Sequence, residues 1–259
     1  MAQRILVLSP LHNLGTTVAA TLIAQNITLN GRSAALAFTD VEPYIAEYCN
    51  LKELDDPMRS VTQVVKLIDS NAIENEDIIN YAHIISKGLY FMNTSTSALT
   101  DVIKQRTVMS IFERITSDVV VCDCSEDIDS PITLSLLSKA DMVFVVVNTS
   151  PKVFRHVRSW IEYSALKDKA ETYLIINQYN EGVGALRNLA KELYRAPSHV
   201  CKIHYNPWIA KCCINGSLHT VLPQVYEKDY RVANLYGDFQ EIQQAITGNL
   251  LYAKQAEEV

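Results

Sequence analysis

The sequence contains no long apolar segment. No run of 18 apolar residues occurs in its 259 residues, and no apolar signal segment stands at its start. A helix needs about 20 mostly apolar residues to cross a bilayer, and a secretory signal needs an apolar core near the N-terminus. We therefore expect a cytoplasmic protein that does not span a membrane.

The sequence also lacks an excess of positive charge. It has 23 basic and 29 acidic residues, a formal charge of −6. Broad electrostatic binding to nucleic acid needs a basic face. The densest short basic segment, Lys152–Arg158, has only Lys152, Arg155 and Arg158, whose spacing places them on one helix face. We expect a solvated helix face here and no strong nucleic-acid binding.

No C-x-x-C pair occurs among the six cysteines. In a reducing cytosol, isolated cysteines usually behave as small buried apolar residues. Cys122 and Cys124 flank Asp123 on a predicted strand, so both point to the face opposite Asp123. We expect them to pack in the interior, and we assign them no metal or redox role.

The sequence does contain the composition and pattern of one large α/β domain. Hydrophobic residues make up 48% and charged residues 20%, and a chain of this length can bury about 70–75% of its unfolded surface. Short runs rich in Val and Ile alternate with helical patterns, which predicts a doubly wound, mostly parallel sheet covered by helices on both faces. We expect one domain over residues 1–259, with a helical surface insertion at 51–82.

Residues 238–259 are predicted to form a C-terminal helix and tail. The apolar residues of this segment fall on one helix face, and the polar face carries glutamines and Glu241 rather than lysines. A helix that lies on a membrane surface usually has a basic polar face. We therefore expect this helix to dock on the domain and not to target a membrane directly. The apolar residues are Phe239, Ile242, Ile246 and Leu250.

The segment Ser9–Thr17 has the setting of a phosphate-binding loop. An apolar strand, Arg4–Leu8, precedes it, and a helical pattern, Val18–Ile27, follows it. Strand, tight loop and helix in this order direct backbone N–H groups and a helix N-terminus at an anion. The usual motif is G-x-x-x-x-G-K-[ST]; Gly15 holds the last glycine and Thr17 the hydroxyl. The alternative is structural, because glycine suits a turn and threonine caps helices well.

The loop and its surroundings resemble the deviant Walker-A family of MinD- and ParA-like ATPases, whose loop reads roughly K-G-G-x-G-K-T-T. Further segments over about residues 3–245 fall in the family's order, although no single motif is intact. They are Ala35–Pro43, Gly88–Asn93, Val119–Asp123, Asp141–Val147, Thr172–Asn180 and His204–Pro207 followed by Ile209, Ala210, Asn215 and Gly216.

The resemblance implies a P-loop NTPase fold, ATP and Mg²⁺ as ligands, and a role for each matching residue. Asp40 would be the catalytic residue that positions the attacking water, with Glu42 in place of the family's second aspartate. Thr17 and Asp123 would hold Mg²⁺, Asp123 through water, and Asn177 would contact the base. Asp123 as a cap and Asn177 as a turn residue are the structural alternatives. The phosphate-binding residues would be His12, Asn13, Leu14, Gly15, Thr16, Thr17 and Val18.

The departures from the family concern its cations. Leu11 stands at the signature lysine and Thr16 at the loop lysine, while His12 and Asn13 replace paired glycines. Each lost charge-assisted hydrogen bond costs about 1.5–3 kcal/mol, and hydrolysis suffers more because charge develops in the transition state. We expect at most a weak ATPase.

A substitute cation would have to come from elsewhere in the fold. No lysine or arginine lies between Arg4 and Arg32. We consider Arg155 or Arg158, on the helix predicted after the Asp141–Val147 strand, as the replacement.

The pattern S-P-x-x-x-x-G-T-[ST], formed by Ser9, Pro10, Gly15, Thr16 and Thr17, resembles the TadZ/CpaE-like branch of the family. That branch positions pilus and secretion machines, although many members carry a receiver-like N-terminal domain that this chain lacks. The resemblance implies a homodimer with a protein partner in a membrane-associated or partition machine. Two alternatives stay open: a plasmid or chromosome partition ATPase, and a nucleotide-free pseudo-ATPase scaffold.

Overall fold

The computed structural model describes residues 2–39, 44–51, 61–92, 101–163, 166, 171–183, 186–192 and 196–257. Eight strands of this part form one sheet in the order β3-β4-β2-β5-β1-β6-β7-β8. Every neighbouring pair is parallel except β3 with β4. The strands are β1 Gln3–Leu8, β2 Ala34–Phe38, β3 His83–Ser86, β4 Leu89–Phe91, β5 Val119–Cys124, β6 Met142–Val147, β7 Thr172–Tyr179 and β8 Val200–His204.

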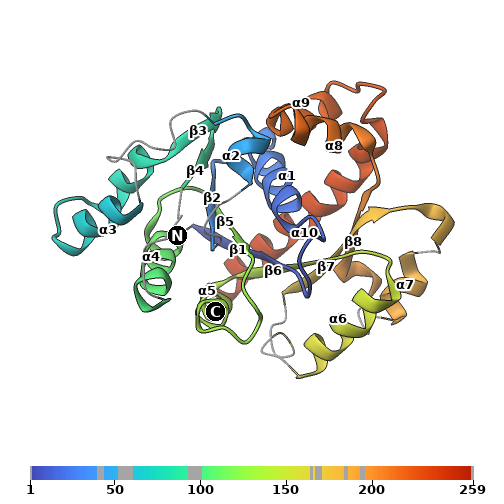
Figure 1. The fold of residues 1–259 in the computed structure, drawn as a ribbon, viewed down its shortest axis with the longest axis horizontal. Coiled ribbons are helices and arrows are strands. Elements are labelled where there is room, and N and C mark those ends of the chain that lie inside the picture. The colour runs from blue at the N-terminus through green and yellow to red at the C-terminus, as the bar shows by residue number, and fades with distance from the viewer. Residues whose placement is uncertain are drawn as a thin grey trace.

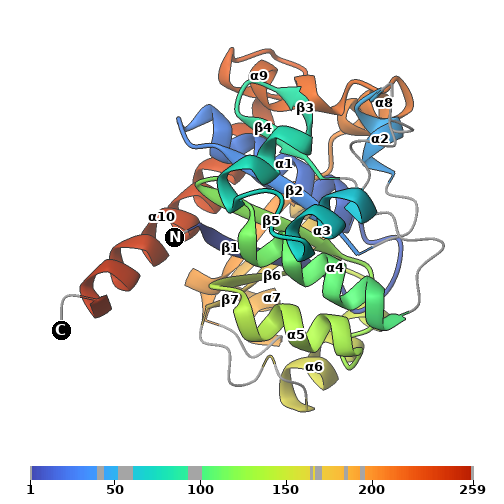
Figure 2. The same cartoon turned by 90° about the vertical axis from the view of Figure 1, so that its left-hand side faces the viewer.

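Helices cover both faces of this sheet, which confirms the predicted doubly wound α/β fold (Figure 1). α1 packs on β5 and β2 and contacts α9 and α10 on one face, while α4 and α5 pack together on the other. Figure 2 shows α4, α5 and α6 on the same side of the sheet. The helices are α1 Thr16–Leu29, α2 Ile45–Tyr48, α3 Val61–Asp69, α4 Asp101–Arg114, α5 Pro131–Lys139, α6 Pro151–Tyr163, α7 Leu186–Glu192, α8 Pro207–Ile214, α9 Val221–Tyr226 and α10 Tyr236–Glu257.

The strands that were predicted from continuous Val and Ile runs lie at the centre of the sheet. All residues of β5 and β6 are buried, as a strand covered by helices on both faces requires. An apolar stripe on α4 and just after its end is buried as well, at Val108, Ile111, Phe112 and Ile115. The core therefore continues through the sheet from one helical layer to the other.

Two edge strands were missed by the sequence analysis. β3 is a short antiparallel strand at one edge, and β8 forms the other edge.

The predicted helical insertion contains α3 and the 3₁₀ helix η2 (Asn75–Tyr81); its residues 52–60 lie outside the described part. Among the described residues, no helix combines the length and apolar character that crossing a bilayer demands.

The six cysteines lie inside the domain, all buried except the half-buried Cys213. Burial raises the pKa of the Cys122 thiol well above its ordinary value, and it raises the pKa of Cys124 as well. Thiols in this state are poor nucleophiles. This environment is consistent with the expectation that they pack in the interior.

The C-terminal helix docks through its apolar face, with Phe239, Ile242 and Ile246 fully buried. The side chain of Leu250 lies outside the described part. A buried polar contact fixes this helix to α1. The amide nitrogen of Asn26 donates to the carbonyl of Phe239 at 3.0 Å, and its oxygen accepts the hydroxyl of Tyr226 at 2.7 Å. One fully buried amide thus ties α1 to both α9 and α10.

Replacing this amide should destabilise the domain. Asn26→Ala leaves the Phe239 carbonyl without its donor and the Tyr226 hydroxyl without its acceptor, and an unsatisfied buried polar group costs about 1–3 kcal/mol. We expect the free energy of unfolding in urea to fall by about 2–4 kcal/mol. Gln244→Ala, an exposed change on α10, should shift it by less than about 0.5 kcal/mol. Equal effects of the two changes would contradict the assigned role of Asn26.

Candidate functional site

The loop between β1 and α1 lies at the point where the sheet connections reverse direction. β1 pairs with β5 on one side and β6 on the other, and open α/β sheets bind ligands outside the carboxyl ends of strands at such a point. The loop takes left-handed conformations at Asn13, with φ 63°, and at Gly15, with φ 83°. Gly15 is the N-cap of α1, and no side chain caps that helix. The first N–H groups of α1 are therefore available to an anion.

Thr17 and Asp123 form the polar centre of the site. The Thr17 hydroxyl donates to Oδ2 of Asp123 at 2.6 Å, and Asp123 is buried at the end of β5. Register places Asp123 beside Val7 of β1, so the strand that leads into the loop also positions the carboxylate. The sequence analysis identified both residues, and the fold brings them into contact.

These residues and the loop line a cleft of about 300 Å³. Its acidic side chains are Asp123, Glu126 and Asp127, and His12 is the one basic residue among the described residues that line it. Arg155 belongs instead to a separate depression with Lys152 and His156 on α6. The lining of the cleft does not support the expectation that Arg155 or Arg158 substitutes for the loop lysine.

The chemistry of the cleft fits Mg²⁺ better than it fits bare phosphate. Hydroxyl and carboxylate oxygens are hard ligands of the kind that Mg²⁺ prefers. No group of three or more His, Cys, Asp or Glu side chains in the described part of the chain could hold a metal alone. Mg²⁺ often completes its coordination with water and substrate phosphates, and Thr17 with Asp123 suits such a site. In the described lining of the cleft, the phosphates would meet backbone N–H groups and no lysine.

A second, more apolar pocket of about 530 Å³ adjoins the cleft. The two hollows share Gly15, Val18 and Tyr48 as lining residues. The other residues that line it come from α2, the end of β7 and the segment around α8. They are Glu47, Asn177, Gln178, His204, Tyr205, Asn206, Ile209, Ala210, Cys213 and Ile214.

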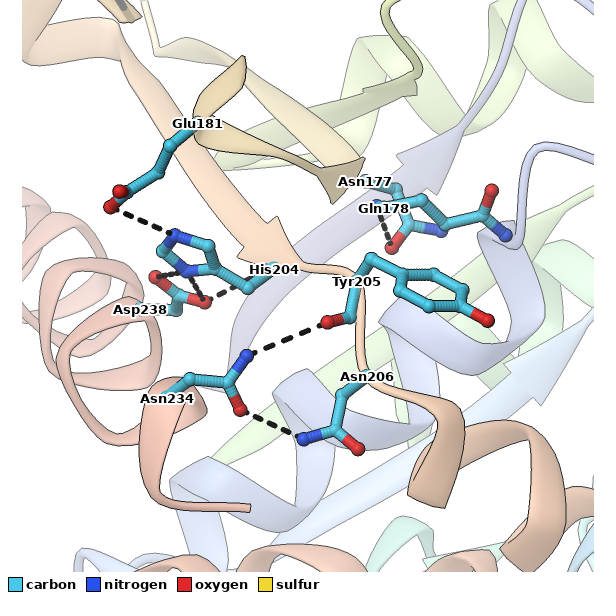
Figure 3. A network of polar contacts seen from close by, with 8 residues as sticks. All are labelled: Asn177, Gln178, Glu181, His204, Tyr205, Asn206, Asn234 and Asp238. Atoms are coloured by element: carbon cyan, nitrogen blue, oxygen red, sulfur yellow. Dashed lines mark hydrogen bonds and ion pairs between the residues drawn. The ribbon is translucent and has the colours of Figure 1, made fainter. Parts of the chain in front are cut away.

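A polar network holds one wall of this pocket in place (Figure 3). Asp238 of α10 accepts the backbone N–H of His204 at 2.8 Å, and its two oxygens lie 2.8 and 2.9 Å from Nδ1 of that ring. Burial raises the pKa of the Asp238 carboxyl, and the hydrogen bonds from His204 act against this rise. Nε2 of His204 lies 3.8 Å from Glu181. The network therefore anchors the end of β8 to the C-terminal helix.

Asn206 extends the same wall. Its oxygen accepts the N–H of Trp208 at 2.8 Å, so it caps α8. Its nitrogen donates to the carbonyl of Arg231 and to Asn234, both at 2.8 Å, and Figure 3 shows Asn206 and Asn234 side by side. These contacts fix the segment that carries the exposed ring of Tyr205.

Asn177 lines the second pocket and packs against Gly15, which lines both hollows. Its amide nitrogen donates to the carbonyl of Leu14 at 2.8 Å, and its oxygen accepts the N–H of Gln178 at 3.0 Å. The residue expected to contact a base therefore also contacts the loop. Asp40 and Glu42 lie outside the described residues.

The sequence analysis missed several residues of the site. Glu126 and Asp127 lie in the turn after β5, and their charges close to Asp123 in sequence could have indicated them. Tyr44 and Tyr48 line the cleft; Tyr44 precedes the short helix α2 and Tyr48 is its last residue, and no motif marks this segment. His204 and Asp238 are 34 residues apart in sequence, and no local pattern links them.

Comparison with known proteins gives the fold. No protein-family model matches the sequence, and no curated protein matches it either. Among solved structures, a ParA family ATPase from Chlorobium tepidum has a TM-score of 0.71 at 13% identity, over 95% of this chain and 99% of that one.

Two further solved structures are similar to this chain. The MinC:MinD complex of Aquifex aeolicus matches with a TM-score of 0.69 and 16% identity, over 95% and 96% of the two chains. MinD of Pyrococcus horikoshii with Mg-ADP matches with a TM-score of 0.66 and 13% identity, over the same shares. Identities this low establish architecture alone. The chain therefore has the fold of the MinD and ParA P-loop ATPases.

Proposed function

We propose that this protein is a MinD/ParA-like positioning or assembly factor for a pilus, secretion or conjugation machine. In this proposal it binds ATP with Mg²⁺ weakly, hydrolyses it slowly or not at all, and works as a homodimer with a protein partner. The proposed binding of nucleotide rests on one observation. The 2.6 Å contact of Thr17 with Asp123 lies beside an uncapped helix N-terminus, in a cleft whose described lining has no lysine or arginine.

The proposed roles follow from this geometry. The N–H groups at the start of α1 bind the phosphates, and Thr17 and Asp123 hold Mg²⁺, which would supply the positive charge that the loop lacks. Asp40 positions a water, and the second pocket receives the base beside Asn177. Because Asp123, Glu126 and Asp127 line the cleft, an anion enters at a cost that the missing lysines would have offset.

Support for the positioning role comes from the solved relatives. One of the similar structures is a MinC:MinD complex, so that relative acts with a protein partner; another is a putative plasmid partition protein. The loop pattern Ser9-Pro10 with Thr16-Thr17 favours the pilus and secretion branch. Pilus or secretion genes beside the gene of this protein would support that assignment, and a centromere-binding partner gene would favour a partition ATPase instead.

The metal pair can be tested by binding. Thr17→Ala and Asp123→Ala should each weaken Mg·ATP in calorimetric titrations, because both side chains act through the metal, while Asp40→Ala should change affinity little. Thr17→Ser keeps the hydroxyl and serves as the matched control. Unchanged affinity in both alanine variants would mean that any nucleotide binds elsewhere, as the pseudo-ATPase alternative requires.

Restoring the lysine should restore affinity. Thr16→Lys adds a charge-assisted hydrogen bond worth about 1.5–3 kcal/mol, so we expect ATP to bind about 10- to 150-fold more tightly. Phosphate release by the unmodified protein should stay well below about 1 s⁻¹, the low end of typical enzyme turnover. Thr16→Gln is the uncharged control. If Thr16→Lys binds ATP no more tightly than Thr16→Gln, residue 16 does not face the phosphates.

The partition alternative predicts binding to DNA. Lys152, Arg155 and Arg158 are exposed on α6, but three cations neutralise few phosphates. We expect no binding to a short random duplex at physiological salt in fluorescence anisotropy, with or without ATP. Micromolar, salt-sensitive binding that Arg155→Glu with Arg158→Glu abolishes would favour a partition ATPase.

A further inference from the structure

Asn177 holds the carbonyl that precedes the first turn of α1. The side chain is 8% exposed at the end of β7, and its amide nitrogen lies 2.8 Å from the oxygen of Leu14. Leu14 is followed directly by Gly15, the N-cap of α1. A hydrogen bond at this point sets the plane of the Leu14–Gly15 peptide, and hence the direction from which α1 starts.

The orientation of the Asn177 amide is itself fixed. Its oxygen accepts the N–H of Gln178 at 3.0 Å, and a flipped amide would put oxygen against the Leu14 carbonyl and nitrogen against an N–H. Gln178 has a left-handed conformation with φ 54°, at the register shift between Asn177 and Tyr179 in the pairing of β7 with β8. The local backbone of β7 is therefore shaped to present the nitrogen to the loop.

Gly15 is packed against the same amide. A Cβ atom built on Gly15 would lie within clash distance of Nδ2 of Asn177, and Gly15 also has φ 83°. Two independent constraints thus require glycine here, one conformational and one steric. Close packing and a hydrogen bond together join β7 to the phosphate loop.

We propose that Asn177 is a positioning residue that orients the N–H groups of Gly15 to Thr17 toward the phosphates and couples the second pocket to the cleft. The carbonyl of Leu14 accepts one of the two N–H groups of the Asn177 amide. The other N–H group donates to a ligand in the second pocket, which Asn177 lines. A ring bound there and the loop carbonyl then share one amide. This inference rests on the proposed function, but its effect on the loop exists without ligand.

Hydrogen exchange of the ligand-free protein tests the positioning role directly. Asn177→Asp keeps the shape and the acceptor for Gln178 but removes the donor, so amides 11–18 should exchange about two- to tenfold faster. Asn180→Ala removes an exposed amide that bonds only within its own turn, and it should leave the loop unchanged. Exchange in Met142–Val147 serves as the internal reference for an intact fold.

Gly15→Ala supplies an independent variant with a matched control. Gly31 has φ 85° and no atom within 4 Å of a built Cβ, so Gly31→Ala reports the conformational strain alone. Gly15→Ala should speed exchange of the loop and weaken phosphate binding, and Gly31→Ala should do neither. In an Asn177→Ala background the added effect of Gly15→Ala should shrink, because the steric partner is gone.

Tripolyphosphate with Mg²⁺ separates positioning from base recognition, since it has phosphates and no base. The proposal predicts that Asn177→Ala, which adds no charge near the phosphates, weakens tripolyphosphate through the disturbed loop and weakens ATP further through the lost contact in the second pocket. Loss of ATP binding alone, with unchanged loop exchange, would overturn the inference and leave Asn177 as a base contact. If the unmodified protein binds neither ligand, the proposed function fails, and the exchange experiment still decides whether Asn177 positions the loop.

Discussion

Parallel pairing of β1 with both β5 and β6 is the constraint on which the site depends. Because the three strands run in one direction, their carboxyl ends meet at one edge, where the chain must leave β1 by a loop and β5 by an acidic turn. Thr17 and Asp123 are 106 residues apart in sequence and yet are in hydrogen-bond contact. Because the strands are buried on both faces, the packed core fixes where β1 and β5 end. It therefore also fixes where the loop and Asp123 lie relative to each other.

The sequence predicted the centre of the fold well because its strands leave a local signature. β5 and β6 are fully buried and read as continuous apolar runs. The edge strands leave no such signature: β3 has four residues with a strongly exposed Ile84, and β8 mixes Lys202 and His204 with apolar residues. Such short strands form because they pair with neighbouring strands, and the local sequence pattern does not reveal this pairing.

The candidate site also has one part that the sequence predicted and one part that it did not. The loop and Asp123 were predicted because each follows directly from a recognisable strand. The second pocket was not, because its wall joins residues such as His204 and Asp238 through tertiary contacts. Asn177 is intermediate: resemblance located it, but its bond to Leu14 depends on how β7 ends. Leu11 and Thr16 stay predictions from resemblance: they would stand where the family has lysines, and the described lining of the cleft has no lysine or arginine.

The acidic lining of the cleft has a consequence for the proposed function, in which the cleft binds nucleotide. Three carboxylates and no described lysine or arginine face the loop, so metal-free nucleotide meets a field of its own sign. A nucleotide that enters with Mg²⁺ carries less negative charge and brings the missing cation with it. Affinities of metal and nucleotide are then linked reciprocally, each raising that of the other. In the proposed function, such a site would respond to the free magnesium level as well as to the nucleotide pool, and a loop with its own lysine would depend less on that ion.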